Sequence, residues 1–162
     1  MPVNRRSLLR MPELREYDPA DFESLWTLDQ RCFDREIAYS REELAHYLRD
    51  ETAVCLLAMD SDALLGFIVG HRDRRGFGHI VTLDVEEKAR RIGVGSLLME
   101  SLEGRFRESG CKSAFLEVAV SNRSALTFYR KHQYNVLKTL RRYYPGDLDG
   151  LLMGKKLGPP QL

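Results

Sequence analysis

Apolar residues recur along this chain with the period of a strand in some segments and the period of a helix in others. The order in which these two kinds of segment follow one another changes near residue 86. Before that point, runs of alternating or β-branched residues predict strands at 14–17, 53–59, 64–71 and 79–85, with helical patterns at 18–33 and 40–50. After it, helical patterns at 94–110 and 122–132 alternate with strands at 113–120, 134–142 and 148–155. The strands at 79–85 and 113–120 are joined through a helix and are expected to run parallel. We therefore predict a mixed α/β (α+β) fold, a single domain whose twisted mixed sheet of about seven strands is flanked by about four helices.

Helix-boundary signals support these elements. Asp18 precedes Pro19, a pairing typical of an N-cap followed by the first helical residue. Ser40 and Glu43 form the Ser-x-x-Glu pattern of a capping box. Gly110 follows the pattern that starts at 94 and is a candidate C-cap.

The composition is that of one globular domain. The chain has 162 residues, of which 43% are hydrophobic and 30% charged, with a net charge of +1. The basic clusters at 72–75, 88–91 and 141–142 each lie near acidic residues, which favours local anion binding over a track for nucleic acid. We expect no direct nucleic-acid partner.

The remaining composition bears on location and boundaries. Cys32, Cys55 and Cys111 are widely spaced and odd in number, which favours a reducing compartment. No stretch approaches the roughly 20 apolar residues of a membrane span, so we expect a cytoplasmic protein without a membrane partner. Residues 1–10 are interpreted either as a disordered extension or as sequence upstream of a start at Met11. The domain is expected over 11–157, with a tail at 158–162.

No metal site is expected. The four histidines share no metal-ligand spacing, and we interpret each as a surface or capping residue: His46, His71, His79 and His132.

A glycine-rich segment stands between the strand at 79–85 and the following helix. It reads Arg90-Arg91-Ile92-Gly93-Val94-Gly95-Ser96. Amides in the first turn of a helix lack intrahelical partners, and the helix dipole adds positive charge, so such a start attracts anions. The segment lacks the Lys-Ser/Thr of a P-loop and the third glycine of a dinucleotide-binding motif. We predict a phosphate site of another kind.

A carboxylate interrupts the next apolar strand. Alternation places Phe115, Glu117 and Ala119 on one face of the strand. Burying Glu117 among apolar residues is costly unless it is paired or lies at a cleft. Tyr129 follows in the next helix, which begins at Asn122. A carboxylate base and a phenolic acid would suit a reaction that removes one proton from a substrate and gives another to a leaving group.

The segment from Arg90 to Gly95 resembles the pyrophosphate loop of the GNAT superfamily of N-acetyltransferases. This resemblance implies acetyl-CoA as co-substrate and a direct transfer to an amine in a ternary complex. It implies that the amides of residues 91–96 hold the pyrophosphate, and that the strand ending in Leu83, Asp84 and Val85 holds the pantetheine arm. The Val85 N–H is the expected donor to the oxygen of the acetyl group.

Residues 116–129 and 141–153 resemble one GNAT branch, the RimI-type ribosomal-protein alanine N-acetyltransferases. The resemblance implies that Glu117 is the general base, Tyr129 the general acid and Asn122 a coenzyme A contact. It also implies a substrate site for a peptide N-terminus, lined by Ile37, Ala38, Tyr39, Tyr143 and Tyr144.

The chain departs from the RimI-type pattern at three points. Ile37-Ala38-Tyr39 replaces a Pro-Trp pair in the loop at the acceptor site, Gln133 stands where glycine usually ends the helix, and Gly150 stands where alanine is common. The acceptor therefore stays open between a protein N-terminus and a small amine such as an amino acid, polyamine or drug. A non-catalytic acyl-CoA-binding regulatory module is the alternative from another class.

Overall fold

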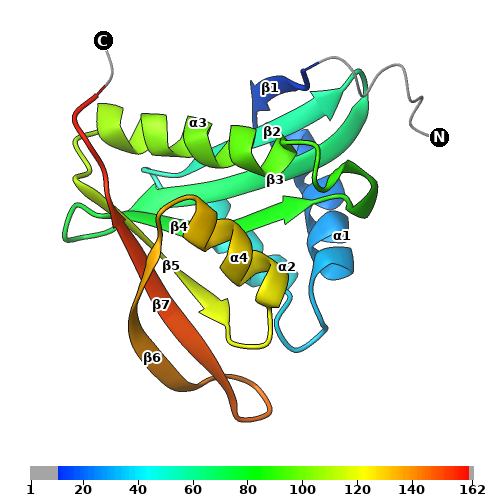
Figure 1. Ribbon diagram of the computed structural model, residues 1–162. Coiled ribbons are helices and arrows are strands. Elements are labelled where there is room, and N and C mark those ends of the chain that lie inside the picture. Colours follow the sequence, from blue (N-terminus) through cyan, green and yellow to red (C-terminus); the bar gives the residue numbers. More distant parts are fainter. Residues whose placement is uncertain (1–10, 161–162) are drawn as a thin grey trace.

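The computed structural model describes residues 11–160, and this part of the chain forms a seven-stranded sheet in the order β1-β2-β3-β4-β5-β7-β6 (Figure 1). The strands are β1 Glu13–Glu16, β2 Val54–Asp60, β3 Ala63–Arg72, β4 Gly78–Val85, β5 Ser113–Ala119, β6 Asn135–Tyr144 and β7 Leu148–Lys156. All neighbouring strands run antiparallel except β4 and β5, which are parallel as predicted.

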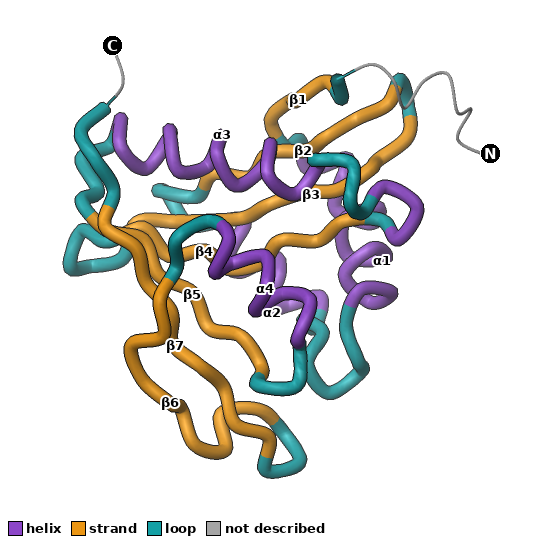
Figure 2. The backbone as a smooth tube through the Cα atoms, in the orientation of Figure 1, coloured by secondary structure: helices purple, strands orange, loops and turns teal. Residues whose placement is uncertain are grey.

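Helices cover both faces of this sheet. Within the described residues there are four α-helices, namely α1 Phe22–Cys32, α2 Arg41–Leu48, α3 Val94–Glu108 and α4 Arg123–Lys131. Helices α3 and α4 lie on one face, and α1 and α2 on the other (Figures 1 and 2). The predicted mixed α/β architecture is confirmed, because strands and helices follow in the expected order.

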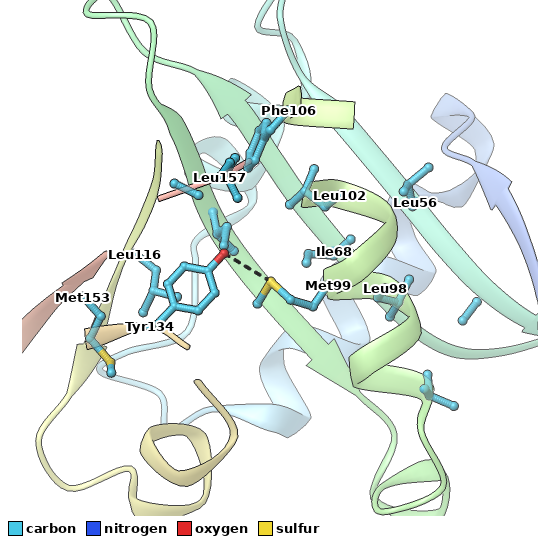
Figure 3. Close-up of a cluster of buried hydrophobic side chains, with 14 of the residues drawn as sticks. Leu56, Ile68, Leu98, Met99, Leu102, Phe106, Leu116, Tyr134, Met153 and Leu157 are labelled. Carbon is cyan, nitrogen blue, oxygen red and sulfur yellow. Dashed lines mark hydrogen bonds between the residues drawn. The ribbon is translucent and has the colours of Figure 1, made fainter. Parts of the chain in front are cut away.

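The two faces have separate cores. Under α3, Leu98 and Leu102 pack with Ile68 of β3 and Leu116 of β5 (Figure 3). On the opposite face, Leu25 of α1 and Leu44 of α2 pack against strands β2 to β4, with Phe67 and Val69 of β3 fully buried among them. Each fully buried aliphatic side chain contributes about 1.5–3 kcal/mol, so these layers provide most of the stabilisation of the fold.

The predicted helix starts are confirmed. Asp18 caps a short 3-10 helix, Pro19–Asp21, that runs directly into α1. Ser40 caps α2 with the complete capping box, in which Ser40 Oγ accepts the Glu43 amide at 3.1 Å.

Two helices end in the same left-handed turn with different residues. After α3, Gly110 has φ 84°, and the Cys111 amide donates to the Phe106 carbonyl at 2.9 Å. After α4, Gln133 has φ 67°, and the Tyr134 amide donates to the Tyr129 carbonyl at 3.0 Å. Both are Schellman ends. Gln133 therefore occupies the left-handed position at which glycine usually ends such a helix.

Strands β4 and β5 separate soon after they meet. Their pairing is confined to Gly78 with Ala114 and His79 with Phe115. Just beyond, β4 holds a bulge at Val81, because Val69 pairs with Thr82 while Gly70 pairs with Ile80. A bulge bends its strand and increases the local twist. It lies where β4 leaves β5, so the C-terminal halves of the two strands border an opening in the hydrogen-bonded sheet.

The chain ends bear on two predictions. The predicted extension, residues 1–10, lies outside the described residues, as do residues 161–162 of the predicted tail. Between 11 and 160, no helix is long and apolar enough to cross a bilayer.

Candidate active site

The N-terminus of α3 lacks a side-chain cap. Gly93 stands at the N-cap position with φ 91°, and Leu97 is the first residue whose amide reaches back, to the Gly93 carbonyl at 3.0 Å. The amides of Val94, Gly95 and Ser96 therefore have no intrahelical partners. The other helices of the described chain differ: side chains cap α2 and α4, and α1 continues from a capped 3-10 helix. The start of α3 thus combines free amides with the positive end of a 15-residue helix.

The two glycines of this segment serve different needs. Gly93 adopts the left-handed conformation that glycine reaches without strain. At Gly95, a Cβ would lie 3.2 Å from Cε2 of Phe128. Gly95 therefore lets α4 approach the first turn of α3.

The flanking side chains of the segment point to protein partners or to solvent. Arg90 folds back, and its Nε donates to the Val85 carbonyl at 3.1 Å, which ties the loop to the end of β4. Arg91, with φ 66°, and Ile92 are exposed. The Ser96 hydroxyl lies 3.0 Å from His132 Nε2 at the end of α4.

Backbone groups near the end of β4 face the opening. The Glu86 amide donates to the Leu65 carbonyl at 2.8 Å, and Gly66 is the antiparallel partner of Val85. Hydrogen-bonded and non-hydrogen-bonded pairs alternate in an antiparallel ladder. The N–H and C=O groups of Leu83 and Val85 therefore point away from β3, towards the side of β5. This is the placement expected for both residues.

Asp84 is different, and the structure contradicts its predicted role in cofactor binding. Its backbone pairs with Phe67 of β3, and its carboxyl is 0% exposed beneath α1. There it accepts the Thr82 hydroxyl at 2.5 Å and lies beside the carboxyl of Asp29, which is also fully buried. Burial, and then the charge of Asp29, raise the pKa of Asp84, and burial raises that of Asp29. Two adjacent buried carboxyls do not readily carry a charge at the same time, so we expect Asp29 and Asp84 to share a proton.

Glu117 lies on the α1–α2 face of the sheet at the opening. Its neighbours Leu116 and Val118 belong to the core under α3, so alternation turns Glu117 the other way. Its Oε2 lies 2.8 Å from His79 Nε2, and His79 Nδ1 lies 2.9 Å from His71 Nε2. The interpretation of His71 and His79 as surface or capping residues was therefore wrong.

Tyr129 lies on the opposite face, in α4. Its ring contacts Phe128 and Tyr134 and packs on the core under α3. No described residue hydrogen-bonds to its hydroxyl. Burial, and then the charge of Asp84, raise the pKa of Tyr129, so the phenol keeps its proton at neutral pH. Asn122, at the start of α4, accepts the Ala125 amide at 3.2 Å through Oδ1, which leaves its NH₂ group as a donor.

Residues predicted for the acceptor gather around Glu117 from the loop between α1 and α2 and from the end of β6. Tyr39 is held by its hydroxyl, which donates to the Val81 carbonyl at 3.1 Å. Burial raises the phenol pKa of Tyr39, Tyr143 and Tyr144, and the charge of Glu117 contributes at all three. Gly150 makes room for the last pair, since a Cβ there would lie 3.1 Å from the Tyr144 ring.

Two predicted acceptor residues make fewer contacts. Ile37 and Ala38 are half-buried in the same loop, where both amides donate to the Asp34 carbonyl at 2.8 Å. They shape the turn that leads into Tyr39.

Sequence reasoning missed His79, His71, Tyr47 and Asp29. The signal for the histidine pair was present, because the two residues stand at matching positions on either side of the β3–β4 turn and are cross-strand partners. Asp29 carried no such signal, since only packing of α1 on β4 brings it to Asp84. No group of His, Cys, Asp and Glu within residues 11–160 is arranged to hold a metal ion.

The chain belongs to the acetyltransferase (GNAT) family, whose pattern matches residues 20–134. It is 38% identical over 104 residues to an uncharacterised N-acetyltransferase of Methanocaldococcus jannaschii, covering 63% of this chain and 66% of that protein. It is 28% identical over 159 residues to human N-alpha-acetyltransferase 30, covering 88% of this chain and 44% of that protein. The chain thus matches only part of the length of these relatives.

Solved structures share the fold. Ard1 from Thermoplasma volcanium superposes with a TM-score of 0.84 at 28% identity, covering 92% of this chain and 99% of that one. The ribosomal-protein-S18-alanine N-acetyltransferase from Escherichia coli gives a TM-score of 0.81 at 20% identity, covering 91% and 95%. At that identity the second likeness concerns the fold alone.

Proposed function

We propose that this protein transfers the acetyl group of acetyl-CoA to the α-amine at the N-terminus of a protein or peptide. The observation that carries the proposal is the placement of Glu117 and Tyr129 on opposite faces of the sheet, at the opening between β4 and β5 and beside the uncapped start of α3.

The residues present fit acetyl-CoA. The free amides of Val94, Gly95 and Ser96 suit a pyrophosphate, and the exposed Arg91 adds positive charge. The backbone groups of Leu83 and the N–H of Val85 suit the amide-containing arm and the thioester oxygen. When bound, acetyl-CoA supplies an acetyl group activated as a thioester.

The side chains then divide the proton transfers. An ammonium group cannot attack a carbonyl, so Glu117 takes a proton from the acceptor amine. The Val85 N–H stabilises the negative charge that develops on the acetyl oxygen. Tyr129, which stays protonated, gives a proton to the departing sulfur.

Two considerations support an N-terminal acceptor. Several relatives are named N-alpha-acetyltransferases, among them a Sulfolobus acidocaldarius protein 40% identical over 81 residues and the human protein above. An α-amine also has a pKa of about 8, against about 10.4 for a lysine side chain, so a carboxylate removes its proton more readily. As the finer form of the proposal, we infer an alanine-starting ribosomal protein as acceptor, in the cytoplasm.

The test is acetyl-CoA turnover, followed as thiol release, on a panel of peptides and small amines. We expect turnover on free peptides and none on the same peptides with a blocked α-amine. A peptide that copies an alanine-starting ribosomal N-terminus should give the highest kcat/KM, and a clear preference for methionine-starting peptides would overturn that finer proposal. Turnover on small amines alone would overturn the peptide acceptor. Coenzyme A binding without turnover on any amine would point to a regulatory module.

A further inference from the structure

A line of polar side chains leads from Glu117 to the protein surface. Glu117 Oε2 lies 2.8 Å from His79 Nε2, and His79 Nδ1 lies 2.9 Å from His71 Nε2. His71 Nδ1 then lies 3.9 Å from Asp50 Oδ2. The side chains of Glu117, His79 and His71 are only 20%, 13% and 16% exposed, whereas that of Asp50 is 40% exposed. We call Glu117, His79, His71 and Asp50 the base network.

The carboxylate of Glu117 sets the direction of these hydrogen bonds. A carboxylate only accepts, so His79 presents Nε2–H to Glu117. In the neutral ring Nδ1 is then an acceptor, and His71 must supply Nε2–H to it. His71 Nδ1 is left without a proton, which fits its distance of 3.9 Å from Asp50, too long for a hydrogen bond. Burial, and then His79, lower the pKa of His71, so the ring is neutral at pH 7.

Packing holds the imidazole rings of His79 and His71 in place. Phe115 stacks on His79 with ring centroids 4.6 Å apart and planes 7° apart. Tyr47 of α2 contacts both histidines, at 5.8 Å from His71 and 6.4 Å from His79. The other titratable groups around the network, from the loops and helices packed against it, are Tyr39, His46, Asp73, Tyr143 and Tyr144.

We propose that His79 and His71 are positioning residues for Glu117, which hold one carboxylate oxygen by hydrogen bonds in series and leave the other oxygen to the acceptor amine. This inference rests on the proposed role of Glu117 as general base. The series also joins Glu117 to the surface. A second proton on His71, placed at Nδ1 against Asp50, makes His71 a cation and strengthens each donation towards Glu117. Glu117 then holds its negative charge more firmly and is a weaker base.

The experiment compares His79→Phe, His79→Gln, His71→Phe and the double variant His71→Phe/His79→Phe. Phenylalanine keeps the ring stacking and removes the donor, whereas glutamine keeps an N–H donor. We expect His79→Phe to lower kcat about 10–100-fold, the range in which residues that orient a reactive group act, with KM for acetyl-CoA unchanged. The acid limb of its kcat/KM profile should move to higher pH, because a carboxylate without its donor takes up a proton more readily. His79→Gln should retain most of the wild-type activity, and the acid limb of its kcat/KM profile should stay near its wild-type pH.

The two histidines should act as one unit. His71→Phe should give a smaller loss than His79→Phe, and the double variant should be no slower than His79→Phe alone. A purely structural role predicts additive losses and an unmoved acid limb, and either result would overturn the inference. If the Phe variants do not fold, His79→Gln and His71→Gln carry the test, since a glutamine at either position that loses all activity while folded also contradicts a role as simple donor.

The control is His46→Phe, an exposed histidine beside Tyr47 that acts on the network only through Asp50 and should move the acid limb much less than His79→Phe does. Glu117→Gln separates the two proposals. If it keeps wild-type turnover, the base assignment fails. If it is inactive while the histidine variants are normal, only the positioning inference fails.

Discussion

Two carboxyl groups on neighbouring central strands face the same helical layer and have opposite surroundings. Asp84 of β4 is fully buried beside a second buried carboxyl, Asp29. Glu117 of β5 is partly exposed and is joined to His79, with three tyrosines near it. The first pair is closed to solvent, and we expect it to share a proton. The second stands at the opening between β4 and β5.

The difference shows that burial alone does not mark the reactive carboxylate. Burial and the neighbouring Asp29 raise the pKa of Asp84, so it holds its proton more firmly than an exposed aspartate, and its place beneath α1 links that helix to the sheet. A carboxylate that accepts from a histidine N–H through one oxygen keeps its other oxygen free. The neighbouring side chain of each carboxyl, more than how deeply the carboxyl is buried, decides whether it can act as a base.

The largest expected effect tests the difference between Glu117 and Asp84 directly. Glu117→Gln removes the base and should lower kcat by about 10²–10⁴-fold. Asp84→Asn keeps the shape of a group that faces away from the opening and should leave kcat close to wild type. Both are measured by thiol release at saturating acetyl-CoA and peptide. Equal losses in the two variants would show that the carboxyls do not differ in the way proposed.

A second substitution tests Tyr129, the proposed general acid on the face of the sheet opposite Glu117. Tyr129→Phe should lower kcat by about 10-fold, less than Glu117→Gln, because a thiol with a pKa of about 8.5 leaves without much help. The ring and its packing are retained, so thermal stability should change little. Full activity in this variant would remove Tyr129 from the mechanism and leave Glu117 untouched.

A third prediction concerns stability and pH at the acid pair. The pKa of Asp84 is raised above that of an unfolded aspartate, about 3.9, so the folded chain binds the extra proton. Stability from this pair is therefore greatest at low pH and is lost as pH rises from about 4 through the folded pKa. Asp84→Asn, whose amide can donate to Asp29, should show a smaller fall in Tm between pH 5 and 9. A steeper fall than in the wild type would contradict the shared proton.

The smallest expected effect concerns stability alone and comes from a substitution at the end of α4. Gln133→Gly relieves a left-handed residue and should stabilise the fold by about 1 kcal/mol, which raises Tm by about 2–4 °C in a chain of this size. Turnover should not change, because Gln133 lies at the end of α4 away from both carboxyls. A lower Tm would mean that the Gln133 side chain, whose Nε2 donates to the Lys131 carbonyl at 3.0 Å, contributes more than the strain it causes.

Much of the fold was predictable because its signals are local. The caps at Asp18 and Ser40, the glycine-rich start of α3 and the left-handed turn at Gln133 each depend on a few neighbouring residues. Boundaries shifted by a residue or two, as for β6, which runs to Tyr144. The order of strands and helices also placed β4 parallel to β5.

Long-range pairing lay beyond such signals. Asp84 appeared in sequence as part of the cofactor strand, and only the ladder with β3 and the packing of α1 turn its groups away from the opening. His71 and His79 are eight residues apart, and only the β3–β4 register aligns them with Glu117.

By itself, then, the sequence determined the elements, the family and the residue types of the site, because helix caps, strand periods and a glycine-rich turn act over a few residues. The tertiary structure decided which carboxyl is open and which is closed. That choice depends on electrostatic partners contributed by other strands and helices, and these meet only when the sheet and its two helical layers have assembled.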